Sequence, residues 1–272
     1  MRNSKTNELV LTGLFTAIII IMAFTPLGYI PLVVINATII HIPVILGSLF
    51  CGPKKGAFLG FVFGFTSCLK ATIVGGTLSS FVFSPVLAAS LVGTSGIFKS
   101  LFIAFVPRIL VGVIPYFVYI SIKKVLASEK KNLWGTVLNV LMSVFLAFGV
   151  YAFLGKMSES LSQAAALGIG IAVGAVVFIV VEAVFIRKST QVIPFVYAGV
   201  AGAMTNTLLV MGSIFVLYKD AYADAIGVAG NAVLGVITGV ISFNGVIEAI
   251  VAAIIVYLVG LVLNTIKPIA TK

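Results

Sequence analysis

The chain has 272 residues, of which 61% are hydrophobic and 9% are charged, and its mean hydropathy is +1.27. Soluble domains carry about 25% charged residues, so this composition excludes a water-soluble protein. The formal net charge is +10, but the basic residues form short clusters between apolar runs, which indicates membrane topology rather than nucleic-acid binding. We therefore expect a single membrane domain over residues 1–272, embedded in a lipid bilayer and without a nucleic-acid partner.

Apolar runs long enough to cross a bilayer recur along the chain and predict an all-α integral membrane protein with about eight spans. The expected spans are residues 9–27, 31–50, 56–72, 99–122, 134–154, 164–186, 193–217 and 234–264. No signal-peptide cleavage site follows the first run, so we expect it to remain as a helix. The stretch Phe81–Val92 is apolar but only about a dozen residues long, and with Pro85 inside it favours a re-entrant or interfacial segment.

Basic residues predict the orientation, because short loops rich in lysine and arginine stay on the cytoplasmic side. If the N-terminus is cytoplasmic, 12 of the 17 basic residues fall on that side, so we expect both termini in the cytoplasm. These residues are Arg2, Lys5, Lys54, Lys55, Lys123, Lys124, Lys130, Lys131, Arg187, Lys188, Lys267 and Lys272. The stretch Ser128–Lys188 has basic flanks around two apolar spans, so a transmembrane hairpin inserted at 125–190 would preserve the orientation of the other helices.

Motifs for catalysis, nucleotide binding and metal binding are incomplete. Gly47–Lys54 resembles a phosphate-binding loop, but a proline stands where the loop requires lysine. Gly93–Gly96 matches the G-x-S-G pattern of rhomboid-type proteases, yet the only histidine, His41, precedes the serine instead of following it. Cys51 and Cys68 lack metal-ligand spacing. We expect no catalytic residue, no cofactor and no metal, so ATP-driven transport would need another chain to bind the ATP.

Small residues recur at helical spacing in two places. Glycines lie every four residues from Gly52 to Gly64, which lets another helix backbone approach closely and favours packing within this bundle. Gly13 and Ala17 form a second pair on the first span. For this pair, packing within the bundle and contact with another subunit both remain open.

Polar groups inside the spans are the strongest functional signal, because an ionisable group in hydrocarbon costs from about 2.5 kcal/mol upward. Arg108, Asn206 and Glu248 each lie about ten to fourteen residues from the outer end of their helix, and therefore at a similar depth. We expect an outward-opening pocket in which Arg108 binds an anion and nearby side chains form hydrogen bonds. These side chains are Asn206, Thr207, Asn244 and Glu248. The alternative is an Arg108–Glu248 ion pair that only neutralises itself.

Two further ionisable residues within the spans have other expected roles. His41 is expected at a shallow depth on the outer side. Glu182 lies close to Arg187 and Lys188 at the cytoplasmic end of its span, so local pairing accounts for it.

These residues belong to motifs that resemble the substrate-binding S components of energy-coupling factor (ECF) vitamin transporters. The motifs are Asn36–Ser48, Gly52–Ala57 with the glycines that follow, Pro107–Gly112, Gly202–Thr207 and Asn244–Ile250. The resemblance covers about residues 1–125 and 190–265, whereas Ser128–Lys188 departs from it. It implies a six-helix bundle in a bacterial plasma membrane that captures a vitamin from outside. It also implies partners, namely a transmembrane T subunit, contacted through Gly13 and Ala17, and two ATPase subunits.

The resemblance also implies a set of vitamin-binding residues near the outer face. They are Asn36, His41, Arg108, Asn206, Thr207, Asn244 and Glu248, with Phe81 and Ser84 of a long outer loop as a lid. The motifs are closest to the pantothenate and cobalamin branches, and Arg108 favours a vitamin that carries a carboxylate, with pantothenate first. A stand-alone carrier of a small organic anion, coupled to ions through Glu248 or His41, is the alternative. A membrane enzyme would need a catalytic pair, which this sequence lacks.

Overall fold

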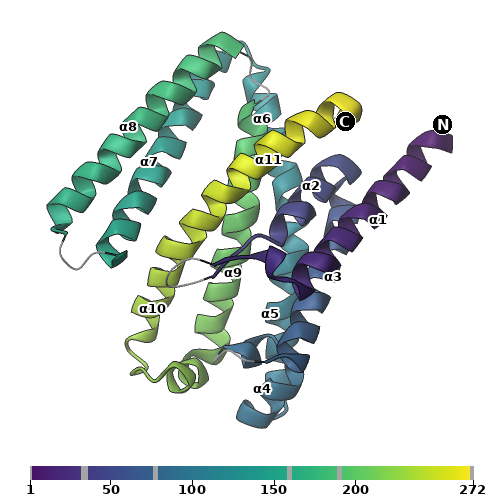
Figure 1. The fold of residues 1–272 in the computed structure, drawn as a ribbon, viewed down its shortest axis with the longest axis vertical. Helices are drawn as coiled ribbons and strands as arrows, with labels where there is room; N and C mark the ends of the chain where they lie inside the picture. Colours follow the sequence, from purple (N-terminus) through teal and green to yellow (C-terminus); the bar gives the residue numbers. More distant parts are fainter. Residues whose placement is uncertain (1, 32–35, 76–78, 158–160, 189–191, 270–272) are drawn as a thin grey trace.

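The computed structural model describes residues 2–31, 36–75, 79–157, 161–188 and 192–269 (Figure 1). Its helices are α1 (Arg2–Phe24), α2 (His41–Cys51), α3 (Pro53–Ile73), α4 (Pro85–Val92), α5 (Ser95–Val111), α6 (Ile114–Leu126), α7 (Lys131–Met157), α8 (Gln163–Lys188), α9 (Val192–Ile226), α10 (Val233–Val240) and α11 (Val246–Ile266). Two 3₁₀ turns, η1 (Pro26–Gly28) and η2 (Ser80–Val82), and one π-helical turn, η3 (Ile241–Gly245), complete the helical elements. The strands β1 (Tyr29–Pro31) and β2 (Asn36–Thr38) form a short antiparallel pair.

Seven helical stretches among the described residues are long and apolar enough to cross a membrane. They are Thr6–Phe24, Pro53–Ile73, Ser95–Leu126, Lys131–Gly155, Gln163–Ala183, Val192–Ile226 and Val233–Ile266. This agrees with the predicted all-α integral membrane protein.

The expected span over 31–50 does not form as a single long helix. The chain there forms the β1–β2 pair and then α2, whose 11 residues cover only about 16 Å. Pro31 ends β1, and a proline at that place would break a helix interior because it lacks an N–H. The helix begins only at His41, so that Pro43 falls in its first turn, where proline is tolerated.

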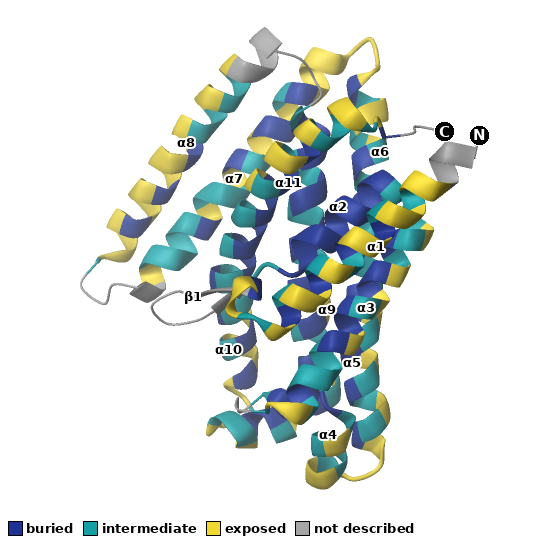
Figure 2. Ribbon diagram, turned by 45° about the vertical axis from the view of Figure 1, so that its right-hand side comes forward, coloured by how far each residue is buried: buried dark blue, intermediate teal, exposed yellow. Residues whose placement is uncertain are grey.

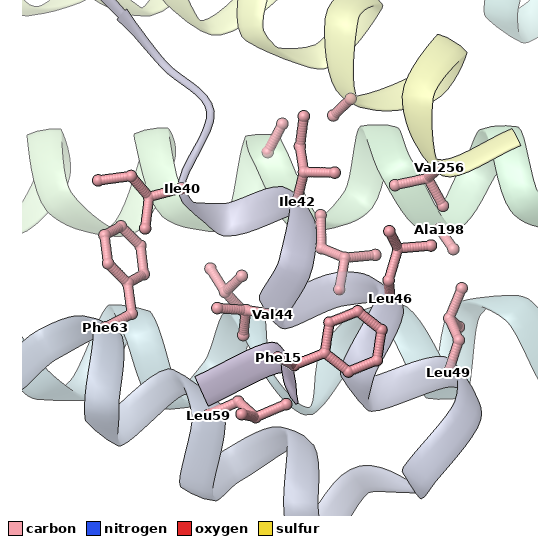
Figure 3. Packing of buried hydrophobic residues seen from close by; sticks show 14 of the residues in the cluster. Phe15, Ile40, Ile42, Val44, Leu46, Leu49, Leu59, Phe63, Ala198 and Val256 are labelled. Atoms are coloured by element: carbon pink, nitrogen blue, oxygen red, sulfur yellow. The ribbon is translucent and has the colours of Figure 1, made fainter. Parts of the chain in front are cut away.

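α2 is the centre of the apolar core. Every residue from His41 to Phe50 is buried, and a helix that is apolar on all sides needs such a place. Figure 3 shows its side chains between Phe15 of α1, Leu59 of α3 and Ala198 of α9. In Figure 2 the buried α2 contrasts with α8, which is mostly exposed. α2 thus fixes the spacing of the helices around it.

The glycines of α3 pack against α5. A Cβ added at Gly56, Gly60 or Gly64 would overlap a backbone carbonyl of α5 or of the turn that follows it. This is the close helix approach within the bundle that the spacing predicts. It brings Phe63 of α3 opposite Arg108 of α5.

Both ends of the described chain lie at the same end of the bundle (Figure 1). The start of α3, with Lys54 and Lys55, and the connection from α6 to α7 lie there too, whereas α4 and the turn between α9 and α10 lie at the opposite end. That the end with the termini faces the cytoplasm remains a prediction from the positive-inside rule.

α7 and α8 form a hairpin beside the bundle, in which the two helices lie side by side (Figure 1). The Glu182 carboxylate accepts hydrogen bonds from Thr136 Oγ1 and Asn139 Nδ2 of α7, each 2.6 Å long. Glu182 therefore joins the two helices, while the side chains of Arg187 and Lys188 lie outside the described part. That this hairpin is an insertion in a six-helix bundle stays a prediction.

Candidate substrate-binding site

A cavity of about 470 Å³ lies between α3, α5, α9, the η3–α11 segment and the segments that hold β2 and η2. Ligand sites in proteins usually measure about 300–1,000 Å³, so a vitamin-sized molecule fits. Aromatic and aliphatic side chains cover part of the wall, among them Phe63, Phe83 and Met211. The polar side chains on the wall are those of Thr38, Ser67, Lys70, Ser79, Ser80, Arg108, Asn206, Thr207, Asn244 and Glu248.

The Arg108 side chain is held by a break in its own helix. Pro107 lies inside α5 and has no N–H, so it cannot donate to the carbonyl of Ile103 four residues earlier. Arg108 Nη1 donates to that Ile103 oxygen instead, at 2.6 Å. The guanidinium also lies over the rings of Phe83 and Phe63, at 4.6 and 5.4 Å from their centroids. The result is a buried cation fixed by one carbonyl and two aromatic faces.

Glu248, which also lines the cavity, joins three elements. The Thr38 N–H of β2 donates to Glu248 Oε1 at 2.8 Å, and Thr207 Oγ1 of α9 donates to Glu248 Oε2 at 3.0 Å. Arg108 and Glu248 therefore line the same cavity, and each has hydrogen-bond partners of its own.

Asn206 and Asn244 both line the cavity. Within the described part of the chain, the side-chain oxygens of both residues are buried and accept no hydrogen bond. A buried acceptor without a partner is costly, and a ligand hydroxyl or amide N–H removes that cost.

Lys70 is the main site residue that the sequence did not point to. It lines the cavity, and its Nζ donates to the Ala23 carbonyl at the end of α1 at 2.9 Å. Phe63, Ser67 and Lys70 follow one face of α3 at helical spacing. That spacing is the signal that would have found them.

Phe81 and Ser84, the residues expected in a lid, do not line the cavity, but two of their neighbours do. Ser80 and Phe83 line the cavity, and residues three apart share a face in a 3₁₀ turn. Phe81 is instead buried edge-to-face against Tyr218, with ring centroids 5.3 Å apart. Ser84 caps α4 by accepting from the Leu87 N–H at 3.3 Å.

His41 and Asn36 are not among the described lining residues of the cavity. His41 begins α2 and is fully buried, and neither of its ring nitrogens has a hydrogen-bond partner among the described residues. The Asn36 backbone belongs to β2, but its side chain lies outside the described part.

Residues 7–187 match the family described as "ECF transporter, substrate-specific component". The chain therefore belongs to this family, as a multi-pass protein of the bacterial plasma membrane that serves vitamin uptake and is a transporter rather than an enzyme. The matched range includes Arg108 and ends in α8, so α9 to α11 lie beyond it.

The chain is also similar to two proteins named as transporters of one vitamin. The pantothenic acid transporter PanT of Lactococcus lactis subsp. cremoris is 42% identical over 161 residues, which cover 55% of this chain and 78% of the relative. The pantothenate transporter PanT of Leuconostoc mesenteroides is 37% identical over 119 residues, which cover 42% of this chain and 51% of the relative.

Proposed function

We propose that this chain captures pantothenate from outside the cell and delivers it through a transmembrane T subunit driven by two ATPase subunits. The observation that carries the choice of substrate is the similarity to two proteins named as pantothenate transporters. The membership in the ECF substrate-specific family supports the mode of transport.

The chemistry of the cavity suits pantothenate. This vitamin has a carboxylate at one end, an amide in the middle and hydroxyl groups at the other end. Arg108 and Lys70 offer cations to the carboxylate, and charge-assisted hydrogen bonds of this kind are the strong ones. The side-chain amides of Asn206 and Asn244 line the same cavity and offer hydrogen bonds to the hydroxyl and amide groups. The aromatic rings beside Arg108 cover the apolar part of the ligand.

The proposed docking face lies on α1. Gly13 and Ala17 are both exposed there, and a Cβ added at Gly13 would meet no described atom within 4 Å. Exposed small residues one helical turn apart let a partner helix approach closely. ATP-driven transport would also need a partner that binds the ATP, because the sequence lacks a complete phosphate-binding loop.

The purified full-length chain tests this proposal without any partner. We expect pantothenate to raise the thermal midpoint and to bind stoichiometrically in calorimetry without ATP, because the cavity belongs to this chain alone. Cobalamin and other vitamins serve as controls in the same assay. Tight binding of another vitamin, together with no binding of pantothenate, would overturn the choice of substrate. Uptake in vesicles that contain only this chain and an ion gradient would overturn the need for ATPase partners.

A further inference from the structure

Helix α7 of the α7–α8 hairpin packs against η3 and the start of α11, two elements that form part of the cavity wall. On α7, the Phe153 ring stacks on Phe243 of η3, with centroids 4.8 Å apart and an angle of 12° between the planes. One turn earlier, Gly149 packs so closely on Val246 that an added Cβ would overlap the Val246 side chain. Phe153 and Gly149 are four residues apart and therefore lie on the same face of α7. This face covers the π-helical turn and the start of α11.

The segment from the end of α10 through η3 to the start of α11 has another face, whose side chains line the cavity. Val240, Asn244 and Glu248 all line it, and they follow one another at intervals of four residues. In a regular α-helix the first and the last of them would differ by about 80° in direction around the axis. A π-helical turn has more residues per turn, so it rotates the chain less per residue and keeps the three side chains along one line.

A π-helical turn inside a helix needs contacts that favour it. Such turns are rare, because the α-helical path is normally preferred, and they are frequently found at functional sites. In η3, Phe243 is buried and its neighbour Asn244 lines the cavity. The two consecutive side chains therefore connect the contact with α7 directly to the wall of the cavity.

We propose that α7 stabilises the π-helical turn η3 through contacts on the side away from the cavity. Phe153 and Gly149 are therefore positioning residues for substrate binding. They hold the turn that aims Asn244 and Glu248 at the ligand, although neither is a lining residue. The inference rests on the proposed function, since it assigns the hairpin a role in binding the same substrate. A small displacement of the turn changes several hydrogen bonds to the ligand at once, because hydrogen bonds weaken steeply with distance and angle.

Point variants of the full-length chain test this inference by calorimetry with pantothenate. Phe153→Leu removes the stacked ring, and Gly149→Ala pushes α7 away from Val246. We expect each variant to weaken binding by roughly three- to tenfold, about the effect of one weakened hydrogen bond to the ligand. Phe153→Tyr keeps the ring and should bind like the wild type.

Two matched controls lie on the same helix. Phe148→Leu changes a ring that is 54% exposed, and Gly155→Ala adds a Cβ that meets no described atom within 4 Å. Both should bind like the wild type. Thermal midpoints without ligand identify a merely structural role, which would lower the midpoint and leave the affinity unchanged. Unchanged affinity in folded Phe153→Leu and Gly149→Ala, whether or not the thermal midpoint falls, would overturn the inference.

The wild-type titration separates the inference from the proposed function. If the wild type binds another vitamin and not pantothenate, the proposed substrate is wrong. The ratio of variant to wild-type affinity for that other vitamin then still tests whether α7 positions the binding residues.

Discussion

Arg108 and Lys70 line the same cavity but are held in different ways. The Arg108 guanidinium is fixed by the Ile103 carbonyl and by two aromatic rings, whereas Lys70 donates to the Ala23 carbonyl at the end of α1. The last carbonyls of a helix have no donor within that helix, so a lysine satisfies one of them. An ammonium group has three donors, and Lys70 can bind a substrate carboxylate while it keeps this bond. Lys70 thus connects the cavity to the helix that we propose as the docking face.

Replacing Lys70 with methionine tests its share in binding. We expect Lys70→Met to weaken pantothenate binding by about tenfold, the effect of one lost hydrogen bond between charged groups. Calorimetry measures the change, and Lys219→Met, which alters an exposed lysine of α9, should have no effect. Equal dissociation constants for Lys70→Met and the wild type would show that Lys70 does not contact the substrate.

The depth of a polar residue within a span could be predicted, but local rotation could not. The five polar residues expected around an outward pocket do line the cavity, because depth follows from the helical rise per residue. Phe81 and Ser84 were expected at the lid, whereas Ser80 and Phe83 line the cavity, because a 3₁₀ turn changes which residues share a face. Hydropathy does not show such a turn.

At the scale of single elements, α5 combines a helix defect with a functional side chain. Pro107 leaves the Ile103 carbonyl without its helical donor, and the Arg108 side chain takes that place. An alanine at 107 would restore the backbone N–H, which would then compete with Arg108 for the same oxygen. The proline therefore favours the orientation of the arginine at the expense of the helix.

Replacing Pro107 with alanine should have opposite effects on stability and on binding. Because alanine is a far better helix former than proline, Pro107→Ala should leave the thermal midpoint of the empty protein unchanged or raise it. Pantothenate affinity should nevertheless fall by roughly three- to tenfold, since the guanidinium loses an orienting hydrogen bond. Calorimetry and thermal denaturation of the same samples check both parts. Unchanged affinity would mean that the Ile103 contact does not position Arg108.

Hydropathy identified the long helices but not the nature of α2. A short helix in the core and one end of a transmembrane helix are both apolar on all sides. The apolar run over 31–50 therefore predicted a membrane span. The structure has only 11 helical residues there, enclosed by the surrounding helices. The prolines were the available signal, and they were outweighed by the length of the apolar run.

At the scale of the whole molecule, the outer surface of α1 is distinct from the substrate cavity. Gly13 and Ala17 are exposed on it together with large apolar residues such as Leu9 and Leu14. If this surface docks a T subunit, its small residues set how closely the partner helix can approach.

A larger side chain on this surface should prevent assembly and leave substrate binding intact. We expect Gly13→Leu to lose most of the T subunit in co-purification from membranes, while its pantothenate affinity stays at the wild-type value. Gly155→Leu, a matched change at an exposed glycine of α7, should assemble normally. Full assembly of Gly13→Leu would exclude this face as the docking site.

The arrangement of the basic clusters could be predicted, whereas the role of the hairpin could not. The start of α3, which contains Lys54 and Lys55, and the connection between α6 and α7 lie at the end that holds both termini. That this end faces the cytoplasm stays a prediction. The contact of α7 with η3 depends on Phe153 and Phe243, which are far apart in the sequence, and no local pattern connects them.

The most direct test compares pantothenate with pantothenol, in which an alcohol replaces the carboxylate. If the cavity binds the carboxylate through Arg108 and Lys70, the wild type should prefer pantothenate by about a hundredfold in calorimetry. Arg108→Gln should reduce this preference by about tenfold, because only the charged ligand loses a charge-assisted partner. A preference that Arg108→Gln leaves unchanged would contradict the central claim that pantothenate binds in this cavity with its carboxylate at Arg108.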